Sequence, residues 1–136
     1  MLSLLFGGKA GQGSRLLARL FADLIAKMGY ETFIMNDYPS LIKGGHTFSL
    51  LAFDSKKVFN FYDSIDGLIA LNQETVEIHK KRLKQLCFIL SECCFELKYK
   101  NKSIKFNFSS EVRHLNIFLL GFLAALFAIP QNLLIR

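Results

Sequence analysis

Tryptophan is absent from this 136-residue chain, and cysteine and proline are scarce, with three and two residues. The three cysteines, Cys87, Cys93 and Cys94, are too few for a disulfide framework, and no Cys-x-x-Cys pair is present. The sequence therefore predicts no zinc or iron–sulfur site built by this chain alone. Reduced, buried thiols in a cytoplasmic protein are the expected alternative.

Long apolar runs are also few. In the longest, residues 115–129, Asn116 is the only polar side chain. A membrane span needs about 20 apolar residues, and Pro130 interrupts this run before that length is reached. We therefore favour a helix buried on nearly every face, in the core or against a partner chain, over a membrane span. Residues 2–6 follow no basic segment and lead directly into glycines, which predicts a strand and not a signal peptide.

Acidic residues are outnumbered, because 17 lysines and arginines against 11 aspartates and glutamates give a net charge of +6. This balance suits an acidic partner such as a phosphorylated ligand, an acidic subunit or nucleic acid. Most of the excess lies between Lys80 and Lys105, without the alternation of basic and aromatic residues typical of a nucleic-acid platform, so nucleic acid is not expected. With 51% apolar and 21% charged residues, residues 1–136 are expected to form one folded domain.

Strand and helix patterns alternate along the chain. Residues 2–6 form a continuous apolar run, typical of a strand buried on both faces. Residues 14–28 carry polar side chains at every fourth position, which predicts a helix lying on a sheet and ending at Gly29. A right-handed crossover would then pair a second strand, residues 32–35, with the first in parallel. Further strands are expected at residues 47–53, 58–62, 67–71, 86–90, 95–99 and 104–108, and further helices at 73–84 and from Ser110 onward.

These elements predict a three-layer α/β/α domain with a mostly parallel central sheet. Residues 47–53 and 58–62 would form one hairpin, and residues 95–99 and 104–108 an edge hairpin.

The first candidate site is a glycine-rich loop, residues 7–13, between the first strand and the first helix. Its bare backbone and the helix N-terminus behind it favour a phosphate or carboxylate. A P-loop is not matched, since Ser14-Arg15 stands where Lys-Ser/Thr is required, so nucleotide hydrolysis is not expected. A dinucleotide fingerprint would place Ala10 where the backbone meets pyrophosphate and Asp37 on the ribose. A purely structural turn is a further alternative.

A second loop holds Gly44-Gly45, another place where the backbone can approach a ligand closely. Together, Gly8-Lys-Ala-Gly-Gln-Gly13 and Asp37-Tyr-Pro-Ser-Leu-Ile-Lys-Gly-Gly-His46 resemble the gamma subunit, or gamma domain, of the 2-oxoacid:ferredoxin oxidoreductases. That family has G-x-G-G-Q-G after its first strand and a tyrosine-proline segment ending in Arg-Gly-Gly after its second. Later matches follow in order, at Asp66-Gly-Leu-Ile-Ala-Leu71 and at Asn116 with Leu120-Gly121.

Two departures from the family pattern lie in the loops. Ala10 replaces a glycine, and Lys43 replaces the arginine, which keeps the charge but loses the planar two-pronged grip on phosphate. The resemblance covers about residues 2 to 130, and the chain is expected to lack the family's C-terminal helix.

The resemblance implies a gamma-type component of an enzyme that oxidatively decarboxylates a 2-oxoacid such as pyruvate or 2-oxoglutarate, reduces ferredoxin and forms an acyl-coenzyme A. Thiamine diphosphate, magnesium and iron–sulfur clusters would belong to alpha, beta and ferredoxin-like delta partners. This chain would supply no catalytic residue and would pack on the thiamine-binding core at the coenzyme A side. The residues expected at that shared surface are Gly8, Gly11, Gln12, Gly13, Tyr38, Lys43, Gly44 and Gly45.

Two rival functions are a stand-alone nucleotide-binding module and an assembly subunit that binds no cofactor. The gamma-type hypothesis requires the two glycine loops to meet at the carboxyl ends of adjacent strands, as one shared surface for an acidic group or a partner chain. Gln12 is expected to donate to a phosphate or to a neighbouring carbonyl, and His46 to contact a ligand or a loop carbonyl. Other polar residues are expected to be structural: His79 and His114, turn-capping Asp63 and Asp66, and the solvated helix face Arg15, Arg19, Asp23 and Lys27.

Overall fold

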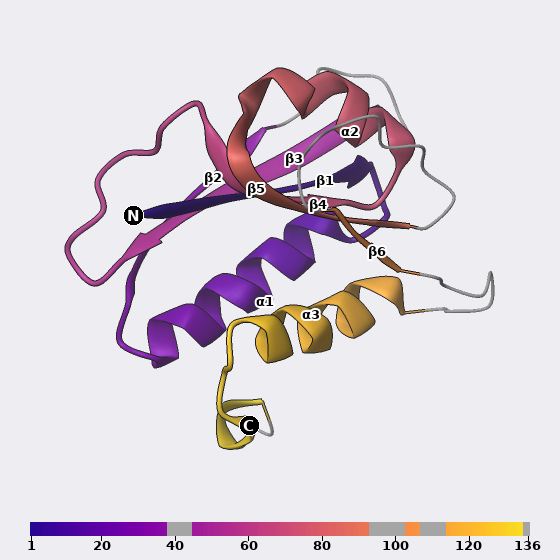
Figure 1. Ribbon diagram of the computed structural model, residues 1–136. Coiled ribbons are helices and arrows are strands. Elements are labelled where there is room, and N and C mark those ends of the chain that lie inside the picture. The colour runs from indigo at the N-terminus through magenta and orange to yellow at the C-terminus, as the bar shows by residue number, and fades with distance from the viewer. Residues whose placement is uncertain (38–44, 93–102, 107–113, 135–136) are drawn as a thin grey trace.

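The computed structural model describes residues 1–37, 45–92, 103–106 and 114–134. A central sheet lies between α2 on one face and α1 and α3 on the other (Figure 1), so the expected three-layer α/β/α class is confirmed. The elements are β1 (Leu2–Lys9), α1 (Ser14–Lys27), β2 (Glu31–Asp37), β3 (His46–Asp54), β4 (Ile65–Ala70), α2 (Gln73–His79), η1 (Lys80–Arg82), β5 (Leu83–Glu92), β6 (Ser103–Phe106), α3 (Leu115–Leu126) and η2 (Gln131–Leu133).

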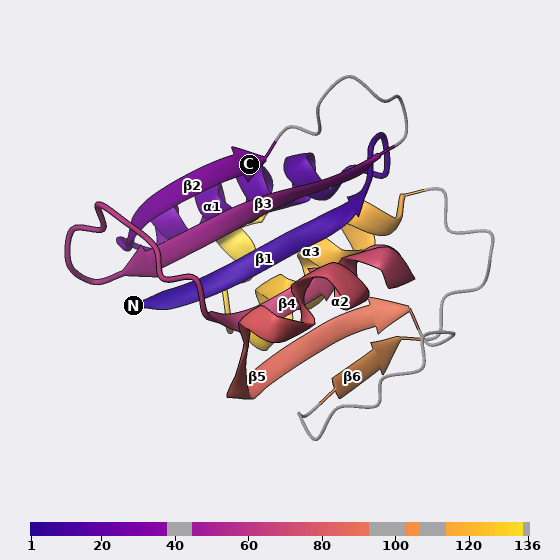
Figure 2. The same cartoon turned by 90° about the horizontal axis from the view of Figure 1, so that it is seen from above.

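The described strands form one sheet in the order β2-β3-β1-β4-β5-β6 (Figure 2). Three of the five neighbouring pairs are parallel (β1–β4, β4–β5, β5–β6), and β3 is antiparallel to both β1 and β2. The predicted direct pairing of the first two strands is therefore wrong, because β3 lies between them. Burial explains this order: residues 49–53 of β3 are fully enclosed, whereas β2 is only half-buried and suits the edge.

Several predicted boundaries differ from the structure. Residues 58–62 form no strand, and Phe59 and Tyr62 are 80% and 66% exposed. The predicted helix over residues 73–84 ends at His79, and Leu83 already begins β5. β6 pairs in parallel with β5, while residues 95–99, the other half of the predicted edge hairpin, lie outside the described residues. Ser110, the predicted start of the last helix, also lies outside them.

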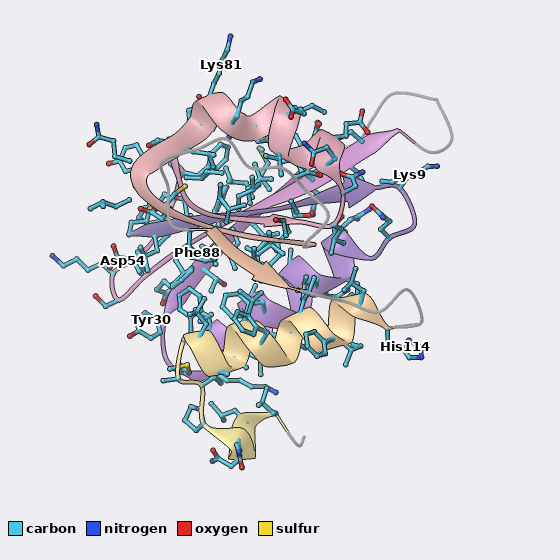
Figure 3. The ribbon with its side chains drawn as sticks, turned by 45° about the vertical axis from the view of Figure 1, so that its right-hand side comes forward. Lys9, Tyr30, Asp54, Lys81, Phe88 and His114 are labelled. Atoms are coloured by element: carbon cyan, nitrogen blue, oxygen red, sulfur yellow. The ribbon has the colours of Figure 1, made fainter. Side chains whose placement is uncertain are left out.

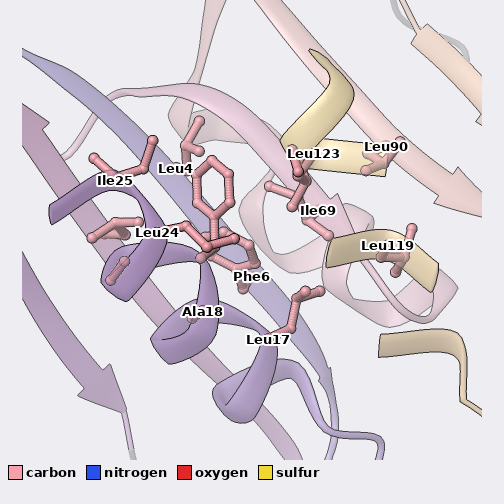
Figure 4. Close-up of a cluster of buried hydrophobic side chains, with 14 of the residues drawn as sticks. Leu4, Phe6, Leu17, Ala18, Leu24, Ile25, Ile69, Leu90, Leu119 and Leu123 are labelled. Carbon is pink, nitrogen blue, oxygen red and sulfur yellow. The ribbon is translucent and has the colours of Figure 1, made fainter. Parts of the chain in front are cut away.

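The sheet is buried on both faces by side chains that alternate along its strands. Leu4 and Phe6 of β1 face α1 and α3, where they meet Leu17 and Leu123 (Figure 4), whereas Leu5 faces α2. Each fully buried leucine or phenylalanine stabilises the fold by about 1.5–3 kcal/mol. These two apolar layers hold the helices against the two faces of the sheet.

The predicted helix end at Gly29 is confirmed. Gly29 has a φ of 91°, its N–H bonds to the Ala26 carbonyl, and the Tyr30 N–H bonds to the Ile25 carbonyl. This pair of bonds is the Schellman motif, which favours glycine because the left-handed conformation carries no β-carbon penalty.

α3 buries only one side, through Leu119, Leu123 and Ala124. On its outer side Ile117 and Phe118 are each 51% exposed. Within this chain, the prediction of a helix buried on nearly every face is therefore wrong, and its cover by a partner chain stays a prediction. Among the helices in the described ranges, none is long and apolar enough to cross a membrane.

Candidate functional site

The two glycine-bearing loops meet at one edge of the sheet. The Ala10 N–H donates to the Gly45 carbonyl at 3.0 Å, and Lys9 lies opposite His46 in the β1–β3 ladder. Because β3 runs antiparallel to β1, the start of β3 lies beside the end of β1. The prediction that the loops meet is confirmed for these residues, but the strands whose carboxyl ends carry them, β1 and β2, are not adjacent, because β3 lies between them. Their joint use as a binding surface stays a prediction. Tyr38, Lys43 and Gly44, which were predicted to complete that surface, lie outside the described residues.

Gln12 closes the first loop with both ends of its side chain. Its Oε1 accepts a bond from the Lys9 N–H at 2.6 Å, and its Nε2 donates to the Leu71 carbonyl at 3.4 Å. Gln12 thus contacts a neighbouring carbonyl, the second of the two expected roles. A β-carbon at Gly8 would lie 2.8 Å from Gln12 Oε1, so glycine leaves room for this closure. The Lys9 side chain itself points away from the sheet (Figure 3).

Gly11 and Gly13 adopt the left-handed conformation, with φ of 92° and 86°. Gly13 is the N-cap of α1 and makes no side-chain cap bond, and the first turn of α1 holds no acidic residue. The first N–H groups of a helix have no partner within the helix, and they carry the positive end of its dipole. This edge is therefore suited to a negatively charged group.

Asn116, at the start of α3, lies against Gly13. Its Oδ1 accepts from the Ile117 N–H at 3.0 Å, and its Nδ2 lies 2.9 Å from the position of a β-carbon added to Gly13. Asn116 therefore places an amide beside the first loop from a distant part of the chain. The sequence contained the signal, a single polar residue in an apolar helix, but the residue was not predicted to belong to the site.

A histidine pair lies on the α2 side of the same edge. His46 Nε2 and His79 Nε2 are 2.9 Å apart, and both rings contact Phe48. Burial, together with the charges of His46 and Arg82, lowers the pKa of His79 to about 4. Burial also lowers the pKa of His46, against opposing effects of Glu74 and Asp37.

At neutral pH both rings are therefore neutral, and one Nε2–H donates to the other ring. His79 was not among the predicted contacts of His46, which were a ligand or a loop carbonyl. Within the described ranges no three histidine, cysteine or acidic side chains gather to hold a metal.

The two aspartates predicted to cap a turn instead form longer-range contacts. Asp66 accepts from the Ser3 N–H at 2.9 Å and pairs with Lys84 at 2.8 Å, and Asp63 pairs with Arg82 at 3.1 Å. Such partly exposed pairs each stabilise a fold by about 0–1 kcal/mol. Their role is structural, as expected. Cys87 is buried, as expected, and Cys93 and Cys94 lie outside the described residues.

The face of α1 predicted to be simply solvated forms one wall of a hollow beside β2. The hollow has a volume of about 370 Å³. Its described lining consists of Arg15, Leu16, Arg19, Ile34 and Asn36. Sequence periodicity placed the two arginines on one face but gave no sign of what lies opposite them.

Comparison with known proteins identifies a family. A profile of the pyruvate ferredoxin/flavodoxin oxidoreductases matches residues 3–136. The chain is 34% identical over 85 residues to a 2-oxoacid:ferredoxin oxidoreductase subunit alpha from Sulfolobus sp, and 33% identical over 85 residues to a subunit alpha from Sulfurisphaera tokodaii. Each match covers 62% of this chain, but only 13% and 14% of those proteins.

The fold also resembles solved structures of this kind. A 2-oxoglutarate:ferredoxin oxidoreductase from Magnetococcus marinus, with 2-oxoglutarate, coenzyme A and succinyl-CoA bound, matches with a TM-score of 0.84 and 23% identity, over 98% of this chain and 25% of that one. The gamma subunit of a keto/oxoacid ferredoxin oxidoreductase from Geobacter sulfurreducens matches with a TM-score of 0.76 and 21% identity, over 95% of this chain and 79% of that one.

Proposed function

The chain belongs to the pyruvate ferredoxin/flavodoxin oxidoreductase family, and we propose that it is the gamma-type component of a 2-oxoacid:ferredoxin oxidoreductase. In this proposal the cytoplasmic complex decarboxylates a 2-oxoacid, reduces ferredoxin and transfers the acyl group to coenzyme A. Thiamine diphosphate, magnesium and iron–sulfur clusters belong to alpha, beta and ferredoxin-like delta partners. This chain contributes no catalytic residue and completes the coenzyme A side of the site.

The observation that carries the proposal is the contact between the two glycine loops. The bond from Ala10 to Gly45 holds them together, and Gln12 ties the first loop to the end of β4. A fixed edge that includes the N-terminus of α1 suits the phosphates of coenzyme A. The surface is open, which suits a substrate held between this chain and a partner.

The outer side of α3 supports a subunit role. Ile117 and Leu126 are 51% and 43% exposed on a helix whose outer positions Gly121 and Ala125 are also apolar and exposed. Contiguous apolar surface of this kind marks protein–protein contacts. We propose that this face packs on the thiamine-binding core. The matching subunit alpha from Sulfolobus sp is long enough to contain such a core, since the match covers only 13% of its length.

The proposal is tested by co-expressing the chain with its candidate partner chains. We expect the tagged chain to co-purify with chains that carry thiamine diphosphate and iron–sulfur clusters. Gln12→Ala in that complex should raise the KM for coenzyme A without abolishing 2-oxoacid-dependent dye reduction, because the loop loses its tie to β4. Lys27→Gln, at the far end of α1, is the matched control.

Two other results would each favour a rival function. Recovery of the chain as a monomer with bound NAD or FAD would indicate a stand-alone nucleotide-binding module, in which Asp37 holds the ribose. Co-purification with an unchanged coenzyme A dependence in Gln12→Ala would instead indicate an assembly subunit without a ligand.

A further inference from the structure

The outer edge of β2 is suited to pairing with another strand. β2 is the last strand on one side of the sheet, and β3 pairs with its inner edge (Figure 2). A strand in this place presents a row of backbone N–H and C=O groups to which a further strand can bond. The backbone groups of β2 therefore divide into those that bond to β3 and those that point outward.

The hydrogen bonds between β1 and β3 determine which groups belong to each set. The Ala10 N–H bonds to the Gly45 carbonyl, and these two residues continue the β1–β3 register by one position. On the other side of β1, the Leu71 N–H bonds to the Gly7 carbonyl, which fits the same alternation. Hydrogen-bonded and non-hydrogen-bonded pairs alternate in an antiparallel ladder. The even-numbered residues of β3 therefore turn their backbone groups toward β2.

The β2–β3 register carries this alternation to the outer edge. Odd-numbered residues of β2 lie opposite even-numbered residues of β3, for example Met35 opposite Leu50, so they bond to β3. The backbone N–H and C=O groups of Thr32, Ile34 and Asn36 therefore point away from the sheet. Among the residues that the structure describes, none forms a backbone hydrogen bond with these outward groups.

β2 also lacks features by which native proteins block a free edge, such as proline, lysine or a bulge. Residues 32–36 read Thr-Phe-Ile-Met-Asn, and the register with β3 runs from Glu31 to Asp37 without a shift. A regular strand of this kind is prone to pair with another chain. Its alternating donors and acceptors are satisfied by the extended backbone of an added strand, as in other complexes formed by strand addition.

The two ends of β2 indicate the charge of the added strand. Glu31 and Asp37 are exposed, and neither forms an ion pair within the described ranges. Both lie on the α2 face together with Phe33 and Met35, because strand side chains alternate and Met35 packs against the α2-side cluster. Opposite charges on directly opposed residues stabilise a strand pair, and like charges destabilise it. A strand with basic ends and an apolar centre therefore fits this edge.

A second copy of this chain matches the edge less well. Two β2 strands related by a twofold axis run antiparallel, and pairing along their full length places Ile34 opposite Ile34. Glu31 of each copy would then lie opposite Asp37 of the other copy, on the same face. This arrangement opposes like charges at both ends of the pair.

We propose that β2 accepts an extended segment of a different chain as an added strand, with an apolar centre and a lysine or arginine at each end. The backbone groups of Thr32, Ile34 and Asn36 bond to the added strand, and Glu31 and Asp37 pair with its basic ends. The inference goes beyond the proposed function, because it rests on the edge of the sheet and not on the gamma-type role.

The test is an NMR titration of the full, isotope-labelled chain, without partner chains, with the peptide Lys-Thr-Val-Thr-Val-Thr-Lys at millimolar concentration. We expect the amide signals of Thr32, Ile34 and Asn36 to shift, and their hydrogen exchange to slow, as the peptide bonds to them. The amides of Phe33 and Met35 are the internal control. They already bond to β3, so their exchange should be slow with and without the peptide.

Thr32→Pro should weaken peptide binding about tenfold, because it removes an outward N–H and places a ring at the edge. The bonds between β2 and β3 are kept, since the Thr32 backbone does not take part in them. Thr32→Ala keeps the N–H and is the matched control, which should bind as the parent chain does. Circular dichroism melting curves establish that each variant is folded.

The charge requirement is tested on the parent chain, so it does not depend on the folding of a variant. A peptide with glutamate in place of both lysines should bind at least about threefold more weakly, because its ends oppose Glu31 and Asp37. Equal binding of the two peptides would overturn the proposed charge of the partner.

Three further outcomes would overturn the inference. They are no peptide-dependent change at Thr32, Ile34 and Asn36, equal binding by folded Thr32→Pro and Thr32→Ala, and protection of these amides that rises with the concentration of the chain alone. The last would identify a second copy as the occupant.

In the purified complex the same three amides should exchange slowly, and rapid exchange there would show that no partner strand lies on this edge. Because the titration needs no partner, its failure is distinguishable from a failure of co-purification, which tests the gamma-type role.

Discussion

Gly13 and Asn116 meet with no space for a side chain between them. A β-carbon on Gly13 would lie 2.9 Å from Asn116 Nδ2, 3.3 Å from its Cγ and 3.4 Å from its Cβ. The N-terminus of α1 and the start of α3 are thus in direct contact, although they are far apart in the sequence. Because of this contact, the effect of a substitution at Gly13 should depend on the residue at position 116 of α3.

Gly13→Ala should therefore destabilise the chain more than Gly11→Ala does. Both residues have positive φ, so each substitution costs about 1–2 kcal/mol of backbone strain. Nothing lies within 4 Å of a β-carbon at Gly11, whereas Gly13→Ala adds about 1–3 kcal/mol of overpacking against Asn116. Urea unfolding measures both costs.

In an Asn116→Ala background the excess cost of Gly13→Ala should largely disappear, since only the 3.4 Å contact with Cβ remains. If the effects of Gly13→Ala and Asn116→Ala on the free energy of unfolding simply add, this contact is contradicted.

Gly8→Ala is expected to loosen the first loop. The added methyl group would lie 2.8 Å from Gln12 Oε1 and 3.0 Å from Leu71 Cβ, so Gln12 must release either Lys9 or Leu71. We expect a loss of about 1–3 kcal/mol in the free energy of unfolding. Gly121→Ala is the matched control, because nothing lies within 4 Å of its β-carbon and it sits within α3.

The control should be neutral or stabilising by up to about 1 kcal/mol, as for a glycine replaced inside a helix. Amide exchange at Lys9, whose N–H is held by Gln12, should quicken in Gly8→Ala and not in Gly121→Ala. Equal behaviour of the two variants would be the contrary result.

The histidine pair should make the fold sensitive to acid. The pKa of His79 falls from 6.5 to about 4 on folding. Between these values the unfolded chain binds a proton that the native chain does not, so stability is complete above pH 6.5 and is lost as pH falls toward 4. From the titration of His79 alone, the free energy of unfolding changes by at most about 1.4 kcal/mol per pH unit. Denaturant unfolding from pH 7 to 5 measures it.

His79→Asn should flatten this slope, since the proton taken up on unfolding is removed with the ring. The comparison uses the slope and not the absolute stability, because the substitution also removes the 2.9 Å bond to His46. A parent chain whose stability does not change over this pH range would show that His79 is not held neutral.

The outer face of α3 is expected to be needed for assembly and not for folding. Ile117 is 51% exposed, so Ile117→Asp should change the free energy of unfolding by no more than about 0.5 kcal/mol. Co-purification with partner chains should be lost, because a charge would be buried at an apolar contact. Ile78→Asp is the control: Ile78 is 49% exposed on α2, across the sheet. Retention of the partners by Ile117→Asp would place the interface elsewhere.

The candidate loops could be found from sequence because their signals are local. Gly11 and Gly13 occupy the left-handed positions that a tight strand-to-helix turn needs, and Gly29 ends α1. The sequence predicted that Gln12 contacts a phosphate or a neighbouring carbonyl. It did not identify Leu71 as the acceptor, because Leu71 lies 59 residues away in the sequence. The pairing of His46 with His79 carried no sequence signal, since neither residue has a metal-type or catalytic spacing to the other.

The sequence by itself determined the alternation of strands and helices, the positions of the two glycine loops and the family to which the chain belongs. Periodicity and glycine placement act over one turn or one strand, so a single chain displays them directly. Only the tertiary structure decided the insertion of β3 between β1 and β2, the half-exposed state of α3 and the wall that faces Arg15 and Arg19. These features depend on which of the apolar segments bury the most surface against one another. That outcome is set by contacts between residues far apart in the sequence, so no local pattern displays it.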